Sequence, residues 1–308
     1  MPGSRRVGVD VGGTKCLGVV IDQHGTVTSW ARRPTATRFD ALASTVAAII
    51  AELDEPGDDI DAVGGTGAGT IGIGLPGLVD RQGRLHAAPH LDDAIDLAPI
   101  EAASILAEHL GREVVLDNDA TCATLAEWRL GAARGLDNMV LVTLGTGIGG
   151  GVVSDGRVLR GEHGFAGEFG HFQVDPLGPA CSCGKRGCWE TFASGRALDA
   201  LAAAGLGMSG EQVEQAARDG DPAAQAVLDE FAHQVAIGLS ALTNMFDPAA
   251  FVLGGGLAQT RDVLAEPLAR WTAEYLYSAS RRPLPALRFA ELGPQAGAIG
   301  AALLSSSG

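Results

Sequence analysis

The sequence predicts an α/β protein built from two lobes. Its 308 residues are more than one small core usually needs, which favours two lobes. Apolar segments with the spacing of strands are interspersed with helical patterns along the chain. A unit of three strands and a helix begins near residue 6, and a similar unit begins near residue 139. Because each unit has a glycine turn after its first strand, we expect a duplicated fold with a cleft between the halves.

The N-terminal half of the sequence has the pattern of three strands and a helix, followed by a strand, a helix, a strand and a helix. The first two strands are expected to form a hairpin across a Gly-Gly-Thr turn. Proline is favoured in the first turn of a helix and glycine just after its end, which sets the bounds of the second helix. The elements are expected at residues 6–11, 16–22, 26–31, 40–53, 71–75, 99–111 and 114–116, with a last helix that ends at Gly131.

The second half predicts three strands, a mainly helical region after the cysteine-rich stretch, and a final strand–helix pattern. The longest helix is expected to end near an Asp-Pro pair, because the residue before proline disfavours helix. The strands are expected at residues 139–145, 151–153, 158–159, 251–253 and 284–289, and the helices at residues 222–245 and 294–304. We assign residues 1–118 and the C-terminal helix, about 294–308, to a small lobe, and residues 119–293 to a large one.

Composition narrows the functional class. The net charge is −15, and no run of Lys or Arg is longer than two residues, so nucleic-acid binding is not expected. No secretory signal opens the chain. The longest uncharged run, residues 62–79, contains seven glycines and a proline, which makes it a poor membrane span. We therefore expect a cytoplasmic protein that binds neither nucleic acid nor membrane.

Three glycine turns follow apolar strands and could bind phosphate. The sequences are DVGGTK, LGTGIGGG and LGGG, and each alone is also compatible with an ordinary turn. A strand-end Asp10 could hold a magnesium-bound water. The GTGIGG stretch continues into a strand rather than a helix, unlike a dinucleotide fingerprint, and no P-loop motif occurs. The candidate nucleotide-binding residues are Asp10, Gly12, Gly13, Thr14, Lys15, Gly145, Thr146, Gly147, Gly254, Gly255 and Gly256.

Two acidic stretches are candidates for catalysis. Asp117, Asn118 and Asp119 stand where a strand gives way to a helix, and one of them is expected there simply as a helix cap. Three polar residues exceed that need, so we expect Asp119 to act as a base. The loop GEHGFAGEFGH adds Glu168 and His171 among glycines, although such a loop could also be only a solvated connection.

The stretch CSCGKRGCWE concentrates three of the five cysteines in eight positions. With His171, ten residues earlier, Cys181, Cys183 and Cys188 form a complete tetrahedral donor set for Zn²⁺. Four protein ligands leave no open position for water, which indicates a structural zinc site rather than a hydrolase. Such a site would also hold Glu168 and Glu190 in place.

Taken in order, DVGGTK, GIGLPG, the strand-end NDA, LGTGIGGG, GEFGH and CSCGKRGCWE resemble the motifs of the ROK family of repressors, open reading frames and kinases. They are most similar to those of its bacterial zinc-containing, ATP-dependent glucokinases. The motifs cover about residues 6–256, and GAIGAALL near the C-terminus is also similar. The resemblance implies the actin-like, ribonuclease-H-like two-lobe sugar kinase fold, with the active site in a cleft between the lobes.

The resemblance also implies roles for individual residues. Asp119 corresponds to the base that takes the proton from the 6-hydroxyl of glucose, which yields glucose 6-phosphate in glycolysis. Structural Zn²⁺ and Mg²⁺ with ATP are the implied cofactors, and the glycine turns correspond to magnesium–phosphate and nucleotide loops. The residues implied in sugar binding are Gly77, Asn118, Asp119, Glu168, His171 and Glu190.

Other readings share these motifs. The substrate could be another hexose or an N-acetylhexosamine, and the donor could be polyphosphate. A sugar sensor without turnover would be expected to lack the base, and Asp119 is present. ROK repressors carry a helix-turn-helix before the kinase-like part, for which a first strand at residue 6 leaves no room. ROK kinases are commonly dimers or tetramers, so a homo-oligomer is expected.

Overall fold

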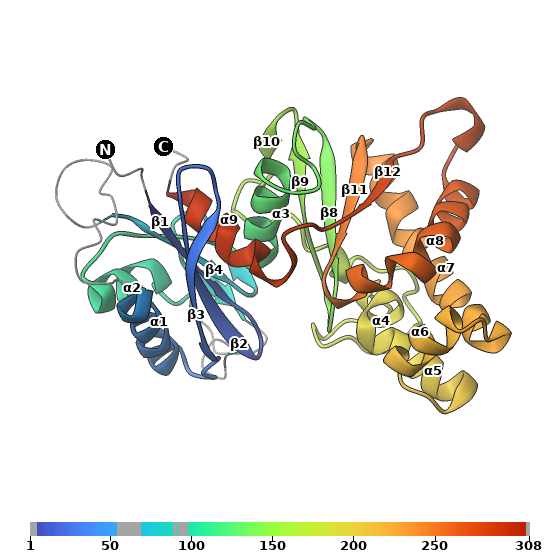
Figure 1. Cartoon of the computed structure of the whole chain (residues 1–308), viewed down its shortest axis with the longest axis horizontal. Helices are drawn as coiled ribbons and strands as arrows, with labels where there is room; N and C mark the ends of the chain where they lie inside the picture. Colours follow the sequence, from blue (N-terminus) through green and yellow to red (C-terminus); the bar gives the residue numbers. More distant parts are fainter. Residues whose placement is uncertain (1–4, 54–68, 89–90, 92–97, 306–308) are drawn as a thin grey trace. The chain divides into compact units, whose positions relative to one another are not determined.

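A computed structural model describes residues 5–53, 69–88, 91 and 98–305 of the chain (Figure 1). It divides into two compact units: unit 1 comprises Met1–Arg134, Val158–Gly167 and Pro294–Gly308, and unit 2 comprises Gly135–Arg157 and Glu168–Gly293. This division differs from the boundary expected after residue 118. Helix α3 (Asp119–Arg129) belongs to unit 1, because it packs against the C-terminal helix α9 (Ala296–Leu304).

Unit 1 contains a five-stranded sheet in the order β3-β2-β1-β4-β7. Its first three strands form an antiparallel meander, whereas β1, β4 and β7 are parallel neighbours. A small ribbon of β5 (Leu78–Val79) and β6 (Leu85–Ala87) follows β4. The strands of the main sheet are β1 (Arg6–Val11), β2 (Lys15–Ile21), β3 (Val27–Pro34), β4 (Ile71–Leu75) and β7 (Val114–Asn118).

Unit 2 repeats this arrangement. Its five-stranded sheet has the order β10-β9-β8-β11-β12, so that β8 corresponds to β1 and β11 to β4. Strands β8 and β9 form an antiparallel hairpin, and β8, β11 and β12 are parallel neighbours. The duplication that the sequence predicts is therefore confirmed in the order and direction of the strands. These are β8 (Met139–Leu144), β9 (Ile148–Ser154), β10 (Arg157–Val158), β11 (Ala250–Gly254) and β12 (Ala286–Phe289).

Helices cover both faces of the unit 1 sheet. On one face, α1 (Phe39–Leu53) packs beside α2 (Ala102–Leu110), and α9 and α3 lie on the other (Figure 1). Where α9 packs on the sheet, both the helix and the strands need small residues. A Cβ atom at Gly8 would lie 2.2 Å from the backbone of Ala302, and one at Gly72 would lie 1.8 Å from the carbonyl oxygen of Ala301. Helix and sheet therefore approach more closely than ordinary side chains allow.

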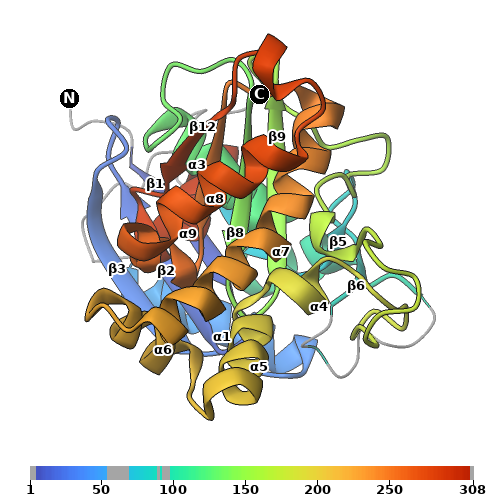
Figure 2. The ribbon, with the colours of Figure 1, turned by 90° about the vertical axis from the view of Figure 1, so that its right-hand side faces the viewer.

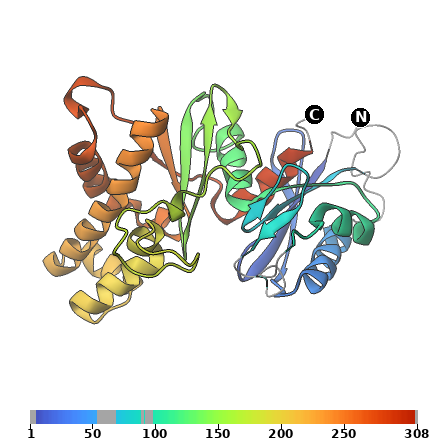
Figure 3. The same ribbon diagram turned by 180° about the vertical axis from the view of Figure 1, so that it is seen from behind.

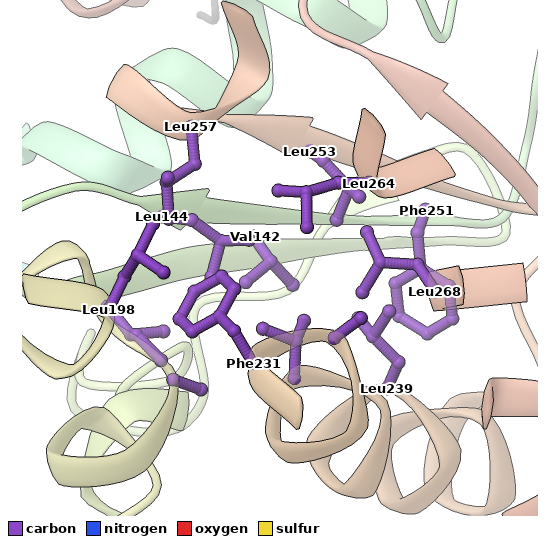
Figure 4. Packing of buried hydrophobic residues seen from close by; sticks show 14 of the residues in the cluster. Val142, Leu144, Leu198, Phe231, Leu239, Phe251, Leu253, Leu257, Leu264 and Leu268 are labelled. Carbon is purple, nitrogen blue, oxygen red and sulfur yellow. The ribbon is translucent and has the colours of Figure 1, made fainter. Parts of the chain in front are cut away.

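The core of unit 2 lies between its sheet and two long helices, α7 (Pro222–Phe246) and α8 (Arg261–Tyr275). Figure 2 shows these helices in front of the strands. Val142 and Leu144 of β8 pack with Phe231 of α7 and Leu264 of α8, among the residues drawn in Figure 4. The remaining helices of this region are α4 (Glu190–Ala193), α5 (Gly195–Leu206) and α6 (Gly210–Arg218). An irregular segment, visible in yellow-green in Figure 3, leads to α4.

Some element bounds differ from those expected. Helix α2 begins three residues after Pro99, because Ile100 first pairs with Leu85 in an isolated bridge. Strand β9 begins at Ile148 because pairing with β8 holds its glycines extended. Strand β12 begins at Ala286, whose N–H bonds to Ala249; the prolines on either side of Leu284 have no N–H to offer. Among the described residues, no helix has the length and apolarity that a membrane span requires.

Candidate active site and metal centre

The junction between β7 and α3 gives each of its three polar residues a different environment. Asn118 is the helix cap: its Oδ1 accepts from Thr121 N at 3.0 Å, and its Nδ2 donates to Gly77 O at 3.0 Å. Asp117 is buried, and its Oδ2 accepts from Arg160 Nε at 2.8 Å. Asp119 opens α3, where one carboxylate oxygen accepts from Ala120 N at 2.8 Å. Capping and ion pairing thus account for the first two residues of the three.

Asp10 lies close to Asp119. A Cβ built on Gly74 would be 3.4 Å from Asp119 Cα and 3.6 Å from Asp10 Oδ1, so both residues border the same glycine of β4. Burial raises the pKa of Asp10 from 3.8 to about 8, the Asp119 carboxylate adds to the rise, and Lys15 opposes it. Asp10 at the end of β1 and Asp119 just after β7 lie on either side of β4. Two carboxyl groups in this arrangement form an environment that a cation or a shared proton would stabilise.

The first glycine turn is tight and exposed. Gly12 N donates to Lys15 O at 3.0 Å, and Thr35, at the end of β3, holds the turn through Gly12 O and Thr14 O. Thr14 and Lys15 themselves are exposed. The turn therefore has a fixed backbone with a hydroxyl and an ammonium group that can reach a ligand, as expected of a phosphate-binding turn.

Only glycine fits at position 77. Its φ is +93°, and a Cβ there would lie 1.9 Å from Ala87 O. Its carbonyl oxygen accepts the Asn118 side chain, so the turn is fixed to the β7–α3 junction. Asp10, Gly77, Asn118 and Asp119 are in this way brought together at one end of the unit 1 sheet.

The corresponding turn of unit 2 connects β8 to β9. Gly145 N donates to Gly147 O at 3.0 Å, and Ile148 N donates to Glu190 Oε2 at 2.9 Å. The third turn, Gly254–Gly256, follows β11. Gly255 has φ +80° and lies against Leu144, where a Cβ would be 2.5 Å from the carbonyl oxygen. Both predicted nucleotide turns of this unit therefore meet at the end of β8.

His171 and the three cysteines form a compact donor cluster. Their ligand atoms all lie within 4.8 Å of one another. Cys183 Sγ is 3.6 Å from Cys188 Sγ, and Cys181 Sγ is 3.7 Å from His171 Nδ1. A tetrahedral zinc ion with ordinary bond lengths requires edges of roughly 3.6–3.8 Å, so the arrangement fits the ion.

The thiols would need a positive charge nearby in order to ionise. Burial raises the pKa of Cys188 to about 12, and its hydrogen bonds with Cys183 and Cys181 contribute to the rise. A cation bound to the cluster would favour the thiolates instead. The donor set therefore fits a closed, structural zinc site in both geometry and charge.

Two carboxylates lie beside this cluster. Glu168 Oε2 is 4.0 Å from His171 Nε2, the nitrogen that does not face Cys181. Burial raises the pKa of Glu168. The electrostatic interaction with His171 opposes this rise, and that with Glu190 adds to it. Glu190 is therefore near enough to act on Glu168, and unit 2 brings Glu168, His171 and Glu190 together. Their binding to a sugar remains a prediction.

Two arginines at these sites were not expected from the sequence. Arg160 pairs with Asp117 across 43 residues, and Arg196 Nε donates to Thr146 O at 3.0 Å from the start of α5. No local signal marks either contact, because each joins segments far apart in the chain. Only the position of each arginine next to a predicted motif could have drawn attention to it.

Comparison with known proteins gives consistent matches. The model of the ROK family matches residues 6–307. A glucokinase from Streptomyces coelicolor is 35% identical over an alignment of 319 positions that covers 97% of this chain and 96% of that protein. An N-acetylgalactosamine kinase from Shewanella is 32% identical over an alignment of 311 positions that covers 96% of this chain and 95% of that protein.

Among solved structures, a ROK family glucokinase from Streptomyces griseus, in complex with glucose and AMPPNP, has a TM-score of 0.85. Its sequence is 34% identical, and the match covers 99% of this chain and all of the other. The fold, with its two related sheets, is therefore that of the ROK sugar kinases.

Proposed function

The chain belongs to the ROK family, and we propose that it transfers the γ-phosphoryl group of ATP to the 6-hydroxyl of glucose, with Asp119 as the general base. The observation that carries the proposal is the division of roles at the β7–α3 junction. Asn118 caps the helix, Asp117 pairs with Arg160, and Asp119 lies beside Asp10 at the strand ends. The similarity to glucokinases supports the choice of glucose.

The chemistry requires little beyond positioning and charge. Asp119 would accept the hydroxyl proton as the sugar oxygen attacks phosphorus, and its place in the first turn of α3 fixes the carboxylate. Asp10 and the Gly12–Lys15 turn would face the phosphates. Mg²⁺ bound with ATP supplies the neutralising charge at the phosphate oxygens. The raised pKa of Asp10 is compatible with a position where a cation is expected.

The polar groups of unit 2 would recognise the sugar hydroxyls. Glu168, Glu190 and His171 Nε2 offer acceptors and a donor, and a sugar hydroxyl that loses its partner lowers the affinity strongly. Zinc bound through His171 Nδ1 and three thiolates would hold this loop in shape. His171 would then serve both the metal and the sugar through its two nitrogens.

A second candidate keeps the fold and the base but changes the substrate. The N-acetylgalactosamine kinase of Shewanella matches 96% of the chain, and the glucokinase of Streptomyces coelicolor matches 97%. The group at the 2-position of the sugar separates the two, because a free hydroxyl and an acetamido group need different space and partners. A kinase for an N-acetylhexosamine is therefore the alternative to test beside glucose.

The test is the initial rate of phosphorylation with Mg-ATP across glucose, mannose, fructose, N-acetylglucosamine and N-acetylgalactosamine. We expect glucose to have the highest kcat/KM. Asp119→Asn should lower kcat by about 10²- to 10⁴-fold, the contribution of a general base, while the Kd for glucose changes little. Asp40→Asn, at an exposed carboxylate of α1, is the control and should retain full activity.

Each outcome of this test distinguishes one part of the proposal from the others. Retention of kcat within threefold by Asp119→Asn would remove Asp119 as the base. Preference for an N-acetylated sugar would establish the second candidate. No transfer from ATP to any sugar would overturn the proposed function, and the same panel with polyphosphate would then test the donor.

A further inference from the structure

The carboxylate of Glu190 is built into the turn between β8 and β9. Its Oε2 accepts from Ile148 N at 2.9 Å, across 42 residues of chain. A Cβ atom on Gly147 would lie 2.3 Å from the same oxygen. A side chain at position 147 would therefore have to displace this carboxylate.

Two residues that follow Glu190 in the chain also hold the turn by hydrogen bonds. Gly195 N donates to Gly145 O at 2.7 Å, and Arg196 Nε donates to Thr146 O at 3.0 Å. Residues 190–196 thus fix three successive parts of the turn. Within the part of the chain that the structure describes, the backbone N–H groups of Thr146 and Gly147 make no hydrogen bond. Two adjacent N–H groups in a fixed turn are an arrangement that binds an anion.

We propose that Glu190 is a positioning residue for the nucleotide: it holds the Gly145–Gly147 turn so that these N–H groups can receive a phosphate. This inference rests on the proposed function, in which the turn binds ATP. It differs from the sugar-binding role expected of Glu190, because it requires an effect on nucleotide affinity when no sugar is present. The second oxygen, Oε1, has no hydrogen bond among the described residues, so one carboxylate could serve both ligands.

The position of Glu190 is itself rigidly determined. The preceding Trp189 is fully buried, its indole N–H donates to Gln234 O at 3.0 Å, and its backbone N–H donates to Phe172 O. Its ring fills the space over Gly238 of α7, where a Cβ would lie 2.1 Å away. Cys188, one residue earlier, belongs to the donor cluster. The metal centre is thereby connected to the nucleotide turn through two residues of chain.

The experiment measures the affinity of the ATP analogue AMPPNP, with Mg²⁺ and without sugar, by isothermal titration calorimetry. Glu190→Ala should bind AMPPNP about tenfold more weakly than the unmodified protein, equivalent to about 1.4 kcal/mol. Glu190→Gln keeps an acceptor for Ile148 N and should stay within about threefold. The matched control is Glu168→Ala, which removes a neighbouring carboxylate that, among the described residues, makes no hydrogen bond to the turn. Its affinity for AMPPNP should be unchanged.

Gly147→Ala tests the same contact from the other side and should also weaken AMPPNP binding, because the added methyl group displaces the carboxylate. Circular dichroism of each variant checks that it is folded. If Glu190→Ala and Glu168→Ala both bind AMPPNP as tightly as the unmodified protein, Glu190 acts on the sugar alone and the inference is overturned. If the unmodified protein itself does not bind AMPPNP, the proposed function fails instead.

Discussion

Replacing Asp10 by Asn should stabilise the protein in the absence of ligands while it impairs catalysis. The Asp10 carboxyl is half-buried, lies near Asp119, and makes no hydrogen bond among the described residues. Asparagine has almost the same shape and no charge. The substitution therefore removes an ionisation that the fold disfavours but that phosphate and magnesium chemistry requires.

The magnitude follows from the pKa of Asp10, which is raised from 3.8 to about 8. At about 1.4 kcal/mol per pKa unit, ionisation lowers the free energy of unfolding by at most about 6 kcal/mol. Because the side chain keeps some contact with water, about a third of this, roughly 2 kcal/mol, is the working figure. The folded protein favours the neutral acid, so the cost is absent below about pH 4, grows as the pH rises, and is complete above pH 8.

Differential scanning calorimetry without added magnesium or nucleotide, at pH 5 and pH 8.5, measures the effect. At pH 8.5 the Tm of Asp10→Asn should exceed that of the unmodified protein by about 4–8 °C, and at pH 5 by less than a third of this. Asp40→Asn, at an exposed site, should show no such difference. An equal gain at both pH values, or a loss at pH 8.5, would refute the argument that ionised Asp10 is held at a cost.

Two other perturbations test the supports of the site. Arg160→Met should leave Asp117 buried without its partner, and we expect it to lower the Tm and to reduce kcat for glucose by at least tenfold. Arg160→Lys should restore part of both quantities. An unchanged kcat in Arg160→Met would mean that the ion pair does not position Asp119. Removal of zinc with a chelator should lower both the Tm and the affinity for glucose, because the loop that carries Glu168 and His171 loses its cross-link. If neither quantity changes, the prediction of a structural zinc ion is wrong.

Local signals were sufficient for much of the fold. Alternating apolar residues identified the strands of both sheets, and Gly111 ends α2 in the left-handed conformation that its sequence position predicts. The cysteine spacing likewise predicted a donor cluster that the structure brings together. These features depend on neighbours in the chain, which a sequence displays directly.

What the sequence could not supply depends on contacts between distant segments. The division into two units differs from the lobe boundary expected after residue 118, because the packing of α3 on α9 joins residues far apart in the chain. The contacts of Arg160 with Asp117, and of Glu190 with Ile148, span more than 40 positions, and their neighbours along the chain give no sign of them. For the same reason a cap among Asp117, Asn118 and Asp119 could be foreseen, but the bond of Asn118 to Gly77 could not.

The glycines of the C-terminal helix connect the fold to the chemistry. A Cβ on Gly297 would lie 2.6 Å from the carboxyl carbon of Asp10, and one on Gly300 would lie 1.7 Å from Cys122 O in α3. Because these positions are glycine, α9 can lie directly against both the end of β1 and the helix that Asp119 opens. That close contact reduces the exposure of Asp10 to water, and burial is the largest cause of its raised pKa. The motif GAIGAALL is thus more than an apolar helix: its small residues create the environment that makes Asp10 costly to ionise.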